Sequence, residues 1–329
     1  MLAYRGSSSD MALGLVGIGS AIIDFAPATL GVPLSKVNSF TPSAGGAVSN
    51  LLVAASRLGL RTGLLGCVGD DEFGSLILRD FEQEGVDTSC VKRIKGRATG
   101  IAFYSVDGKG ERHYAFYRLP GYSDPEAMLR PEDIEEEYIA QSRMLHFSES
   151  LLRRNETRDA VFKALKIAKD CDVSVSYDPN MRAELWEDKK GFLETQREAL
   201  DLANIFLATL KEASLIVGRG AVDVTAERVL AFGPDIVVIR GKSFHQVTTP
   251  SRSFRTPVLK VKAVDTSGAG DAFDAGFLTG LIREWPLERA VSLGSAVAAL
   301  KVMKAGTRGG LPRMDEAAKF LEEQSKSSF

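Results

Sequence analysis

Hydrophobic residues recur along the chain in short strand-like runs that alternate with longer stretches of helical spacing. The first run, Leu13–Ile23, predicts one buried strand that ends at Asp24. Later strand-like runs are Thr62–Val68, Thr99–Val106, Arg112–Tyr117, Met144–Phe147, Val173–Tyr177, Ile205–Ala208, Ile236–Ile239 and Ser253–Val261. Helical patterns between them are Ala47–Leu58, Phe73–Glu84, Thr157–Lys169, Lys190–Leu202, Lys211–Val217 and Thr225–Phe232. Strands that alternate with helices predict an α/β fold, doubly wound, with a mainly parallel sheet and helices on both faces.

The segment 97–118 departs from this alternation. Its two strand-like runs flank a DGKG turn, and no helical pattern lies between them. This is typical of a β-hairpin, and a hairpin inserted in an α/β core is well placed to cover a site. Residues 1–12 contain the polar run SSSD and are expected to be a loose leader before a folded region over 13–329.

Composition narrows the class of protein. The 329 residues include 41 basic and 43 acidic side chains, a net charge of −2 that gives no electrostatic case for nucleic acid. Cys67, Cys90 and Cys171 lie far apart, which fits a reducing cytoplasm better than a disulfide framework or a zinc site. No apolar stretch approaches membrane-spanning length, and the N-terminus lacks the apolar core of a signal peptide. We therefore expect a soluble cytoplasmic protein without a membrane or nucleic-acid partner.

The stretch 263–281, AVDTSGAGDAFDAGFLTGL, carries the clearest chemistry. Val258, Val261 and Val264 predict a strand leading to Asp265, a turn of small residues follows, and Asp271 opens an apolar helical run. Unpaired N–H groups and the positive end of the helix dipole would then face one point, which suits phosphate. Within this pattern Asp271 either accepts a proton from a hydroxyl attacking that phosphate or merely complements the helix dipole.

Two long motifs resemble one family. DTSGAGDAF is similar to the C-terminal signature of the ribokinase-like (PfkB) carbohydrate kinases, and GGAVSNLLVAASRLG at 45–59 resembles their N-terminal signature. The resemblance runs from about Leu13 to Phe320 and implies a ribokinase-like kinase domain with a small β lid, formed by insertions at about 31–44 and 97–118. It implies that Asp271 is the catalytic base and that the Gly268, Ala269 and Gly270 amides form the anion hole.

The same resemblance implies a sugar site. Asp24 would bind two sugar hydroxyls at the edge where open α/β sheets bind ligands, although a loop or capping role is the alternative. Gly46 and Asn50 would bind the sugar before and within the first helix. Arg118 and Arg182 lie in segments that resemble those of fructokinases and 2-keto-3-deoxygluconate kinases, whose matching arginines face the substrate. Surface or supporting salt bridges are the alternative for both arginines.

The ATP site is expected in three further segments. ATLKEASLIVG at 208–218 resembles the family's N-x-x-E region, with Thr209 in place of the Asn and Glu212 as the carboxylate that binds Mg²⁺ through water. Arg240 and Gly241 fall in the region that binds ATP phosphates, together with Gly268 and Gly270. The cofactors implied are ATP and Mg²⁺ with a monovalent cation, and the family also implies a homodimer formed through the lid.

The substrate is the finer question. Five stretches, IIDFAP, TGIAFYS, GERHYAFYR, HFSESLL and DPNMRAELW, look like those of fructokinases. The ketodeoxygluconate kinases tend to have Tyr at the positions of Ala102 and Phe116, so fructose is favoured. Alternatives are 2-keto-3-deoxygluconate, ribose or a nucleoside. A catalytically silent sugar or nucleotide sensor is the non-enzyme alternative, which the intact Asp271 and its GAG turn disfavour.

Overall fold

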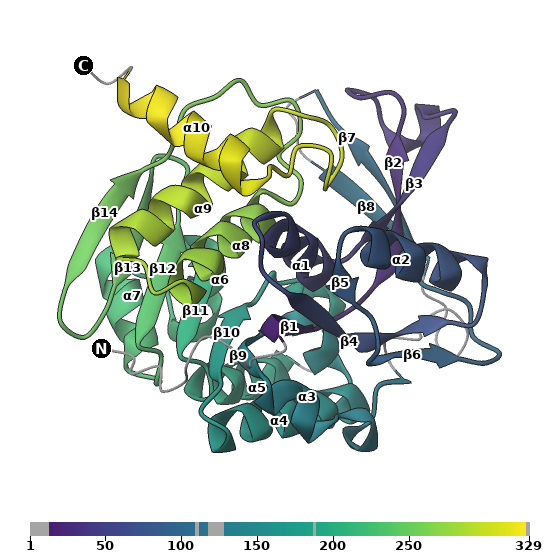
Figure 1. Ribbon diagram of the computed structural model, residues 1–329, viewed down its shortest axis with the longest axis horizontal. Helices are drawn as coiled ribbons and strands as arrows, with labels where there is room; N and C mark the ends of the chain where they lie inside the picture. The colour runs from purple at the N-terminus through teal and green to yellow at the C-terminus, as the bar shows by residue number, and fades with distance from the viewer. Residues whose placement is uncertain (1–12, 109–111, 118–127, 187–188, 327–329) are drawn as a thin grey trace.

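The large sheet of the protein is open and mainly parallel (Figure 1). The computed structural model describes residues 13–108, 112–117, 128–186 and 189–326. In spatial order the sheet contains β14 (Ser253–Pro257), β13 (Phe244–Thr248), β12 (Ile236–Arg240), β11 (Ile205–Thr209), β10 (Ser174–Asp178), β9 (Ser142–Ser148), β1 (Leu13–Ile18), β4 (Thr62–Gly69) and β5 (Val86–Asp87), and β6 (Val91–Ile94) also pairs with β4. All pairs from β5 to β12 are parallel, whereas β13 is antiparallel to both of its neighbours. The predicted fold class is confirmed.

Helices cover both faces of this sheet. One core cluster packs it against α3 (Glu136–Ala140), α4 (Asn155–Asp170), α5 (Lys189–Asp201), α6 (Leu210–Val217) and α7 (Val222–Leu230). The other cluster includes α1 (Ala47–Arg57), α2 (Glu72–Gln83), α8 (Ala269–Ile282), α9 (Leu287–Val302) and α10 (Met314–Lys326). Neighbouring strand residues point to opposite clusters, as Leu15 and Val16 do, because side chains alternate along a strand. This burial on both faces explains why the strands read as continuous hydrophobic runs.

The helices predicted from spacing lie within three residues of those observed, but α3, α9 and α10 were not among them. α9 lies between α8 and α10 (Figure 1) and buries residues on most of its circumference, so it has no clear apolar stripe. α10 follows it near the C-terminus, and its apolar face packs on α9. The strand β13 was also missed, since Phe244–Thr248 is half polar.

A second, small sheet has the order β3–β2–β7–β8 and lies beside the large one (Figure 1). Its strands are β3 (Phe40–Gly45), β2 (Ile22–Pro27), β7 (Ile101–Val106) and β8 (Arg112–Tyr117). β7 and β8 form the antiparallel hairpin that the DGKG turn predicted. The leader 1–12 lies outside the described residues.

Two predictions about strands were wrong. The run Leu13–Ile23 is not one strand: it breaks after Ile18, and β2 leaves the large sheet to become a central strand of the small one. At the break α1 packs so closely that a Cβ on Gly19 would lie 2.6 Å from the Val48 side chain. The predicted strand before Asp265 is also absent, because β14 ends at Pro257 and the chain then crosses to α8 without pairing.

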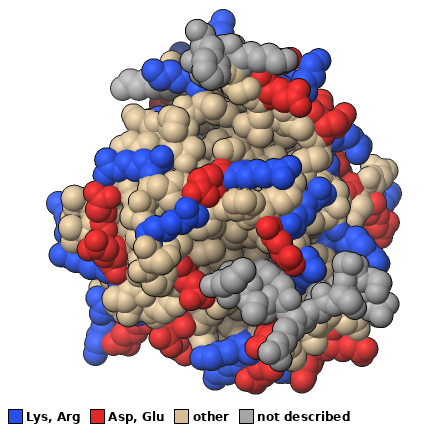
Figure 2. Space-filling model, turned by 60° about the vertical axis from the view of Figure 1, so that its left-hand side comes forward, with Lys and Arg blue, Asp and Glu red and all other residues tan. Residues whose placement is uncertain are grey.

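The surface shows no single dominant charge on the face seen in Figure 2, where basic and acidic side chains alternate. Within the described ranges, no helix has the length and apolar character needed to cross a bilayer.

Candidate active site

A cavity of about 260 Å³ lies where three parallel strands end. Asp178, Thr209 and Arg240 are the last residues of β10, β11 and β12, and all three line it. The start of α8 and residues of the small sheet form the other walls. The predicted site residues that line the cavity are Asp24, Gly46, Asn50, Arg182, Thr209, Glu212, Arg240, Gly268, Ala269, Gly270 and Asp271. Gly241 is not among the described lining residues, and Arg118 lies outside the described part of the chain.

The turn before α8 has the form that an anion site requires. Gly268 is the N-cap residue and has a φ of 66°, in the left-handed region that favours glycine. A Cβ at this position would also lie 3.1 Å from the carbonyl oxygen of Thr307. The helix begins at Ala269, two residues earlier than predicted, so that Asp271 lies within its first turn. Backbone N–H groups at such a helix start lack intrahelical acceptors and can bind an anion.

The carboxylate of Asp271 is held between two amide side chains. Asn50 Nδ2 donates to Asp271 Oδ2 at 3.0 Å, and Asn180 Nδ2 lies 3.4 Å from Asp271 Oδ1. Asp271 is only 8% exposed, yet it lines the cavity. Donors on both oxygens favour the ionised carboxylate and fix its orientation.

Asn180 was not predicted as a site residue, although it follows β10 at the ligand-binding edge of the sheet. Its φ of 41° is uncommon for a residue other than glycine, but Asn tolerates this conformation. Asp178 Oδ1 accepts the backbone N–H of Asn180 at 3.1 Å and so stabilises the turn that directs the amide toward Asp271.

Both polar atoms of the Asn50 side-chain amide form hydrogen bonds with other side chains. Its Oδ1 accepts a hydrogen bond from Arg308 Nε at 3.0 Å, while its Nδ2 is bound to Asp271. Arg308 is buried, pairs with Asp80 and packs over the ring of Phe81. Asn50 lines the cavity as predicted, but its amide is already engaged by the protein and orients the Asp271 carboxylate. Arg308 was missed because nothing in its local sequence points to Asn50.

Asp24 lines the cavity from β2, not from a strand of the large sheet. Its carboxylate lies against the backbone of β3, where a Cβ on Gly45 would be 2.3 Å from Asp24 Oδ2. Gly46 has a φ of 108°, and a Cβ there would lie 2.2 Å from the carbonyl oxygen of Ser20. Glycine is therefore required at both positions. At Gly45 the Asp24 carboxylate leaves no room for a Cβ, and at Gly46 the positive φ and the nearby Ser20 carbonyl exclude one.

Arg240 does not extend freely toward a phosphate. Its guanidinium is buried between two carboxylates, with Nη1 2.6 Å from Asp274 Oδ1 and Nη2 3.0 Å from Asp178 Oδ1. Burial disfavours its charge, but the two aspartates outweigh this and the pKa of Arg240 is raised. Burial likewise raises the pKa of Asp178 and of Asp274, and the charge of Arg240 opposes that rise. Its donors thus hold β10, β12 and α8 together, and its part in binding ATP phosphates stays a prediction.

Asp274 was missed, although it lies one turn after Asp271 on a helix that is otherwise apolar. A buried acid in such a helix requires a partner, and that signal was available in the sequence. The Arg240 guanidinium also lies against the glycine-rich turn at the start of α8, since a Cβ on Gly270 would be 3.2 Å from Arg240 Nη1.

Thr209 and Glu212 form a capping box at the start of α6. Thr209 N and Oγ1 donate to Glu212 Oε2 at 2.8 and 2.6 Å, and the backbone N–H of Met181 donates to Glu212 Oε1 at 3.0 Å. Burial opposes ionisation, but the charge of Arg240 and these hydrogen bonds outweigh it and lower the pKa of Glu212. Thr in place of the family's Asn therefore serves as a helix cap. Glu212 remains an ionised carboxylate at the cavity wall.

The remaining wall carries aromatic and basic side chains. Tyr114 and Phe116 of β8 line the cavity with their rings stacked at a centroid distance of 5.3 Å. Arg182 also lines it, and its Nη1 donates to the carbonyl of Met181 at 3.1 Å. Arg153, which was not predicted, is another lining residue, and its Nε lies 3.3 Å from Glu149 Oε2. Ala102 is fully buried and is not a described lining residue, so it loses the substrate-facing position that the prediction gave it.

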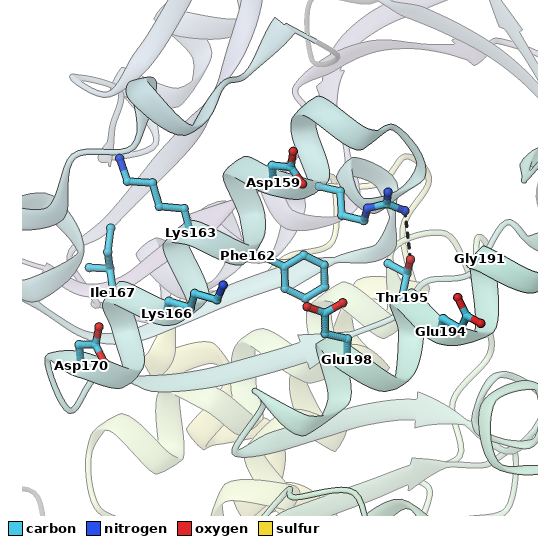
Figure 3. A pocket seen from close by; sticks show the side chains of 11 residues that line it. Asp159, Phe162, Lys163, Lys166, Ile167, Asp170, Gly191, Glu194, Thr195 and Glu198 are labelled. Atoms are coloured by element: carbon cyan, nitrogen blue, oxygen red, sulfur yellow. Dashed lines mark hydrogen bonds between the residues drawn. The ribbon is translucent and has the colours of Figure 1, made fainter.

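A second hollow lies between α4 and α5 (Figure 3). Its lining includes Lys163 and Lys166 from α4 and Glu194 and Glu198 from α5. None of the predicted site residues is among the described residues that line it. The described residues also contain no group of three or more His, Cys, Asp or Glu side chains that could hold a metal ion by themselves.

Comparisons with known proteins agree with this geometry. Residues 13–314 match the model of the pfkB family carbohydrate kinases. The chain is 32% identical to a 5-dehydro-2-deoxygluconokinase of Clostridium botulinum (strain Alaska E43 / Type E3), over 99% of this chain and 97% of the relative. It is 31% identical to "Probable fructokinase-2" of Arabidopsis thaliana, over 94% of this chain and 96% of the relative.

A solved fructokinase of Vibrio cholerae O395, described as bound to fructose, ADP and potassium ion, is similar in structure with a TM-score of 0.84. It is 26% identical, and the match covers 96% of this chain and all of that chain (100%). The named relatives, in the sequence comparison and in the structural one, are kinases. The family transfers phosphoryl groups to an alcohol acceptor. The chain belongs to the pfkB family of carbohydrate kinases.

Proposed function

We propose that this protein transfers the γ-phosphoryl group of ATP to a sugar hydroxyl, with Asp271 as the general base. The observation that carries the proposal is the Asp271 carboxylate, fixed by two amides beside an anion-binding turn at the cavity wall. A hydroxyl placed between Asp271 and the turn would lose its proton to the carboxylate as it attacks phosphorus. The amides of Gly268, Ala269 and Gly270 would hold the negative charge that develops.

Mg²⁺ fits this site as an ion held mainly by water and phosphate. Glu212 is ionised and lines the cavity, but both of its oxygens already accept hydrogen bonds from the protein. Such a carboxylate suits contact through water, because Mg²⁺ usually keeps several water ligands. The ion would neutralise charge on the phosphates. Glu212, for its part, would orient the water that lies between it and the ion.

Fructose is the first candidate for the sugar. The Arabidopsis and Vibrio relatives are named fructokinases, and the Vibrio structure is described with fructose. Among the lining residues, Asp24 would offer a carboxylate to sugar hydroxyl groups, and the stacked Tyr114 and Phe116 would offer an aromatic wall. Neither feature requires a charge on the sugar.

A carboxylated sugar is the second candidate, because Arg153 and Arg182 both line the cavity. Guanidinium groups bind carboxylates in a fork geometry. The Clostridium relative is named for such a sugar, 5-dehydro-2-deoxygluconate. The charge of Arg153 is partly neutralised by Glu149, so Arg182 is the residue on which this candidate depends.

A coupled assay of ADP formation with fructose, 5-dehydro-2-deoxygluconate, 2-keto-3-deoxygluconate, ribose and adenosine tests the proposal. We expect kcat/KM for fructose to exceed that for either acidic sugar by about tenfold, or roughly 1.4 kcal/mol of transition-state binding. Asp271→Asn should lower kcat by about 10²–10⁴-fold while binding nucleotide normally. Activity of Asp271→Asn within a few-fold of wild type would mean that Asp271 is not the base.

Arg182→Gln separates the two sugar candidates, with the exposed Arg61→Gln as its matched control. If the sugar carries a carboxylate at Arg182, this change should lower kcat/KM for the acidic sugars far more than for fructose. Preference of wild type for an acidic sugar, lost in Arg182→Gln but not in Arg61→Gln, would move the assignment to the second candidate.

A further inference from the structure

Lys301 is an unusual residue because its ammonium group lies inside the protein. It occupies the last turn of α9 and has no exposed surface (0%). Its Nζ donates to the backbone carbonyl of Asp265 at 2.8 Å. A buried ammonium is costly unless oxygen atoms receive it, so a protein keeps one only where its charge is well compensated.

The contact falls at the beginning of the anion-binding turn. Asp265 is the residue before Thr266, and Thr266 lines the active-site cavity. The carbonyl that receives Lys301 belongs to the same peptide unit as the N–H of Thr266. An ammonium on that carbonyl polarises the peptide and makes its N–H more positive. The charge of Lys301 thus reaches the phosphate region through one peptide unit without touching a ligand.

Each oxygen of Asp265 already accepts a hydrogen bond from the protein. Its Oδ1 accepts the N–H of Ser267 at 3.0 Å and also the Ser267 hydroxyl, and its Oδ2 accepts the N–H of Gly306 at 2.8 Å. Its carbonyl faces the Lys301 ammonium. A potassium ion requires several oxygen ligands with free lone pairs. An ion placed on these oxygens would also be repelled by Lys301 at close range.

This arrangement disagrees with the expected monovalent cation. The Vibrio relative is described as potassium-bound. A cation that assists the turn must lie behind it, among oxygen atoms, since the front is open to phosphate. In this chain the oxygens of Asp265 behind the turn are taken by the protein, so the residues do not fit the ion.

We propose that Lys301 supplies, as part of the chain, the positive charge that a monovalent cation would bring to the turn. This kinase would then work without potassium. The proposal rests on the proposed sugar-kinase function. In it Lys301 is a positioning residue that acts through the Asp265–Thr266 peptide.

The first test compares wild-type rates in potassium chloride and in tetramethylammonium chloride of equal ionic strength. Tetramethylammonium is too large to replace potassium among protein oxygens. We expect kcat to differ by less than about twofold between the two salts. A wild-type enzyme that needs potassium, with a rate rising about tenfold or more as the ion is added, would overturn the proposal.

The second test asks whether removing the Lys301 ammonium makes kcat depend on potassium. Lys301→Ala removes the ammonium and leaves space, and we expect it to lose about tenfold or more in kcat in tetramethylammonium and to recover much of that loss in potassium or ammonium chloride. Lys304→Ala is the matched control, since Lys304 is exposed one turn away. It should behave as wild type in every salt. A Lys301→Ala enzyme that is fully active without a small cation would contradict the proposal.

A measurement that does not depend on turnover accompanies these rates. The melting temperature of Lys301→Ala should rise with potassium but not with tetramethylammonium, whereas that of wild type should respond equally to both salts. If wild type phosphorylates none of the sugars in either salt, the proposed function fails. The melting temperatures then still show whether Lys301 takes the place of a bound potassium ion. If Lys301→Ala does not fold even with potassium, the wild-type comparison decides alone.

Discussion

At the scale of single residues, the polar groups around the cavity are held by the protein before any ligand arrives. Asn50 is fixed between Arg308 and Asp271. Glu212 is fixed by Thr209 and by the backbone of Met181. Groups held in this way need little reorganisation when charge develops in the transition state, which is how preorganised sites lower a barrier.

His146 provides a prediction about pH at the same scale. It is buried on β9 with its Nδ1 3.0 Å from Ser176 Oγ, and burial, together with the charge of Arg240, lowers its pKa from 6.5 to about 3. Below pH 6.5 the His146 side chain is protonated in the unfolded chain but stays neutral in the folded one. The stability linked to His146 is therefore complete above pH 6.5 and is lost as pH falls toward 3.

Replacing His146 by Gln should remove this pH-dependent contribution to the free energy of unfolding. We expect the free energy of unfolding to fall by about 2 kcal/mol less between pH 7 and pH 5 than it does in wild type. Urea denaturation at the two pH values measures this, with the exposed His113→Gln as control. An unchanged pH dependence in His146→Gln would mean that His146 does not stay neutral in the folded protein.

The role of a residue could be predicted from the sequence when its partners lie close to it along the chain. Asp271 and Gly46 stand in local motifs whose geometry is dictated within a few residues. The contact between Arg308 and Asn50 joins segments that are 258 residues apart, and no local pattern encodes it. Arg240 was assigned to phosphates because it falls in the region that binds ATP phosphates in the family, whereas its pairing with Asp178 and Asp274 was visible only in the folded structure.

At the scale of elements, the ends of two strands of the large sheet are tied to the helix that carries Asp271. Arg240 at the end of β12 binds Asp178 at the end of β10 and Asp274 in α8. The position of α8, and with it that of Asp271, is thus set by the sheet. The break of Leu13–Ile23 into two strands was not predicted, because the segment Gly19–Ala21 is short and the hydrophobic runs on its two sides read as one.

Arg240→Met should be strongly destabilising. It leaves two buried carboxylates without a positive partner, and we expect the free energy of unfolding at pH 7 to fall by about 3–5 kcal/mol in urea denaturation. The exposed pair Arg255–Asp223 gives the control, since Arg255→Met should cost less than about 1 kcal/mol. Adding Asp274→Asn to Arg240→Met should recover part of the loss. A double variant less stable than Arg240→Met alone would argue against charge as the cause.

At the scale of the whole molecule, the cavity lies between the large sheet and the small one. Asp24 of β2 and Phe116 of β8 reach it from the small sheet, while Asp271 reaches it from the helix layer. A sugar held by both parts would draw them together and exclude water from the phosphate. That the small sheet acts as a lid, and that it forms a homodimer, remain predictions.

Closure predicts that ATP hydrolysis without sugar is slow. We expect ADP formation in the absence of sugar to be about a hundredfold slower or more than transfer at saturating sugar, because an open cavity lacks the assembled site. The two rates are compared with one coupled assay. Asp24→Asn, which weakens the hold of the small sheet on sugar, should need more sugar for the same acceleration. Equal rates with and without sugar would rule out this gating role.

The hairpin of β13 and β14 has a consequence for the behaviour of the protein at high concentration. An open sheet ends in unpaired backbone groups that can recruit a strand from another molecule and start aggregation. Here one side ends with β5, a strand of only two residues, and the other with β14, which carries Arg255 and finishes at Pro257 without an N–H to donate. The hairpin thus gives the parallel sheet a charged, proline-terminated border that resists extension by a neighbouring molecule.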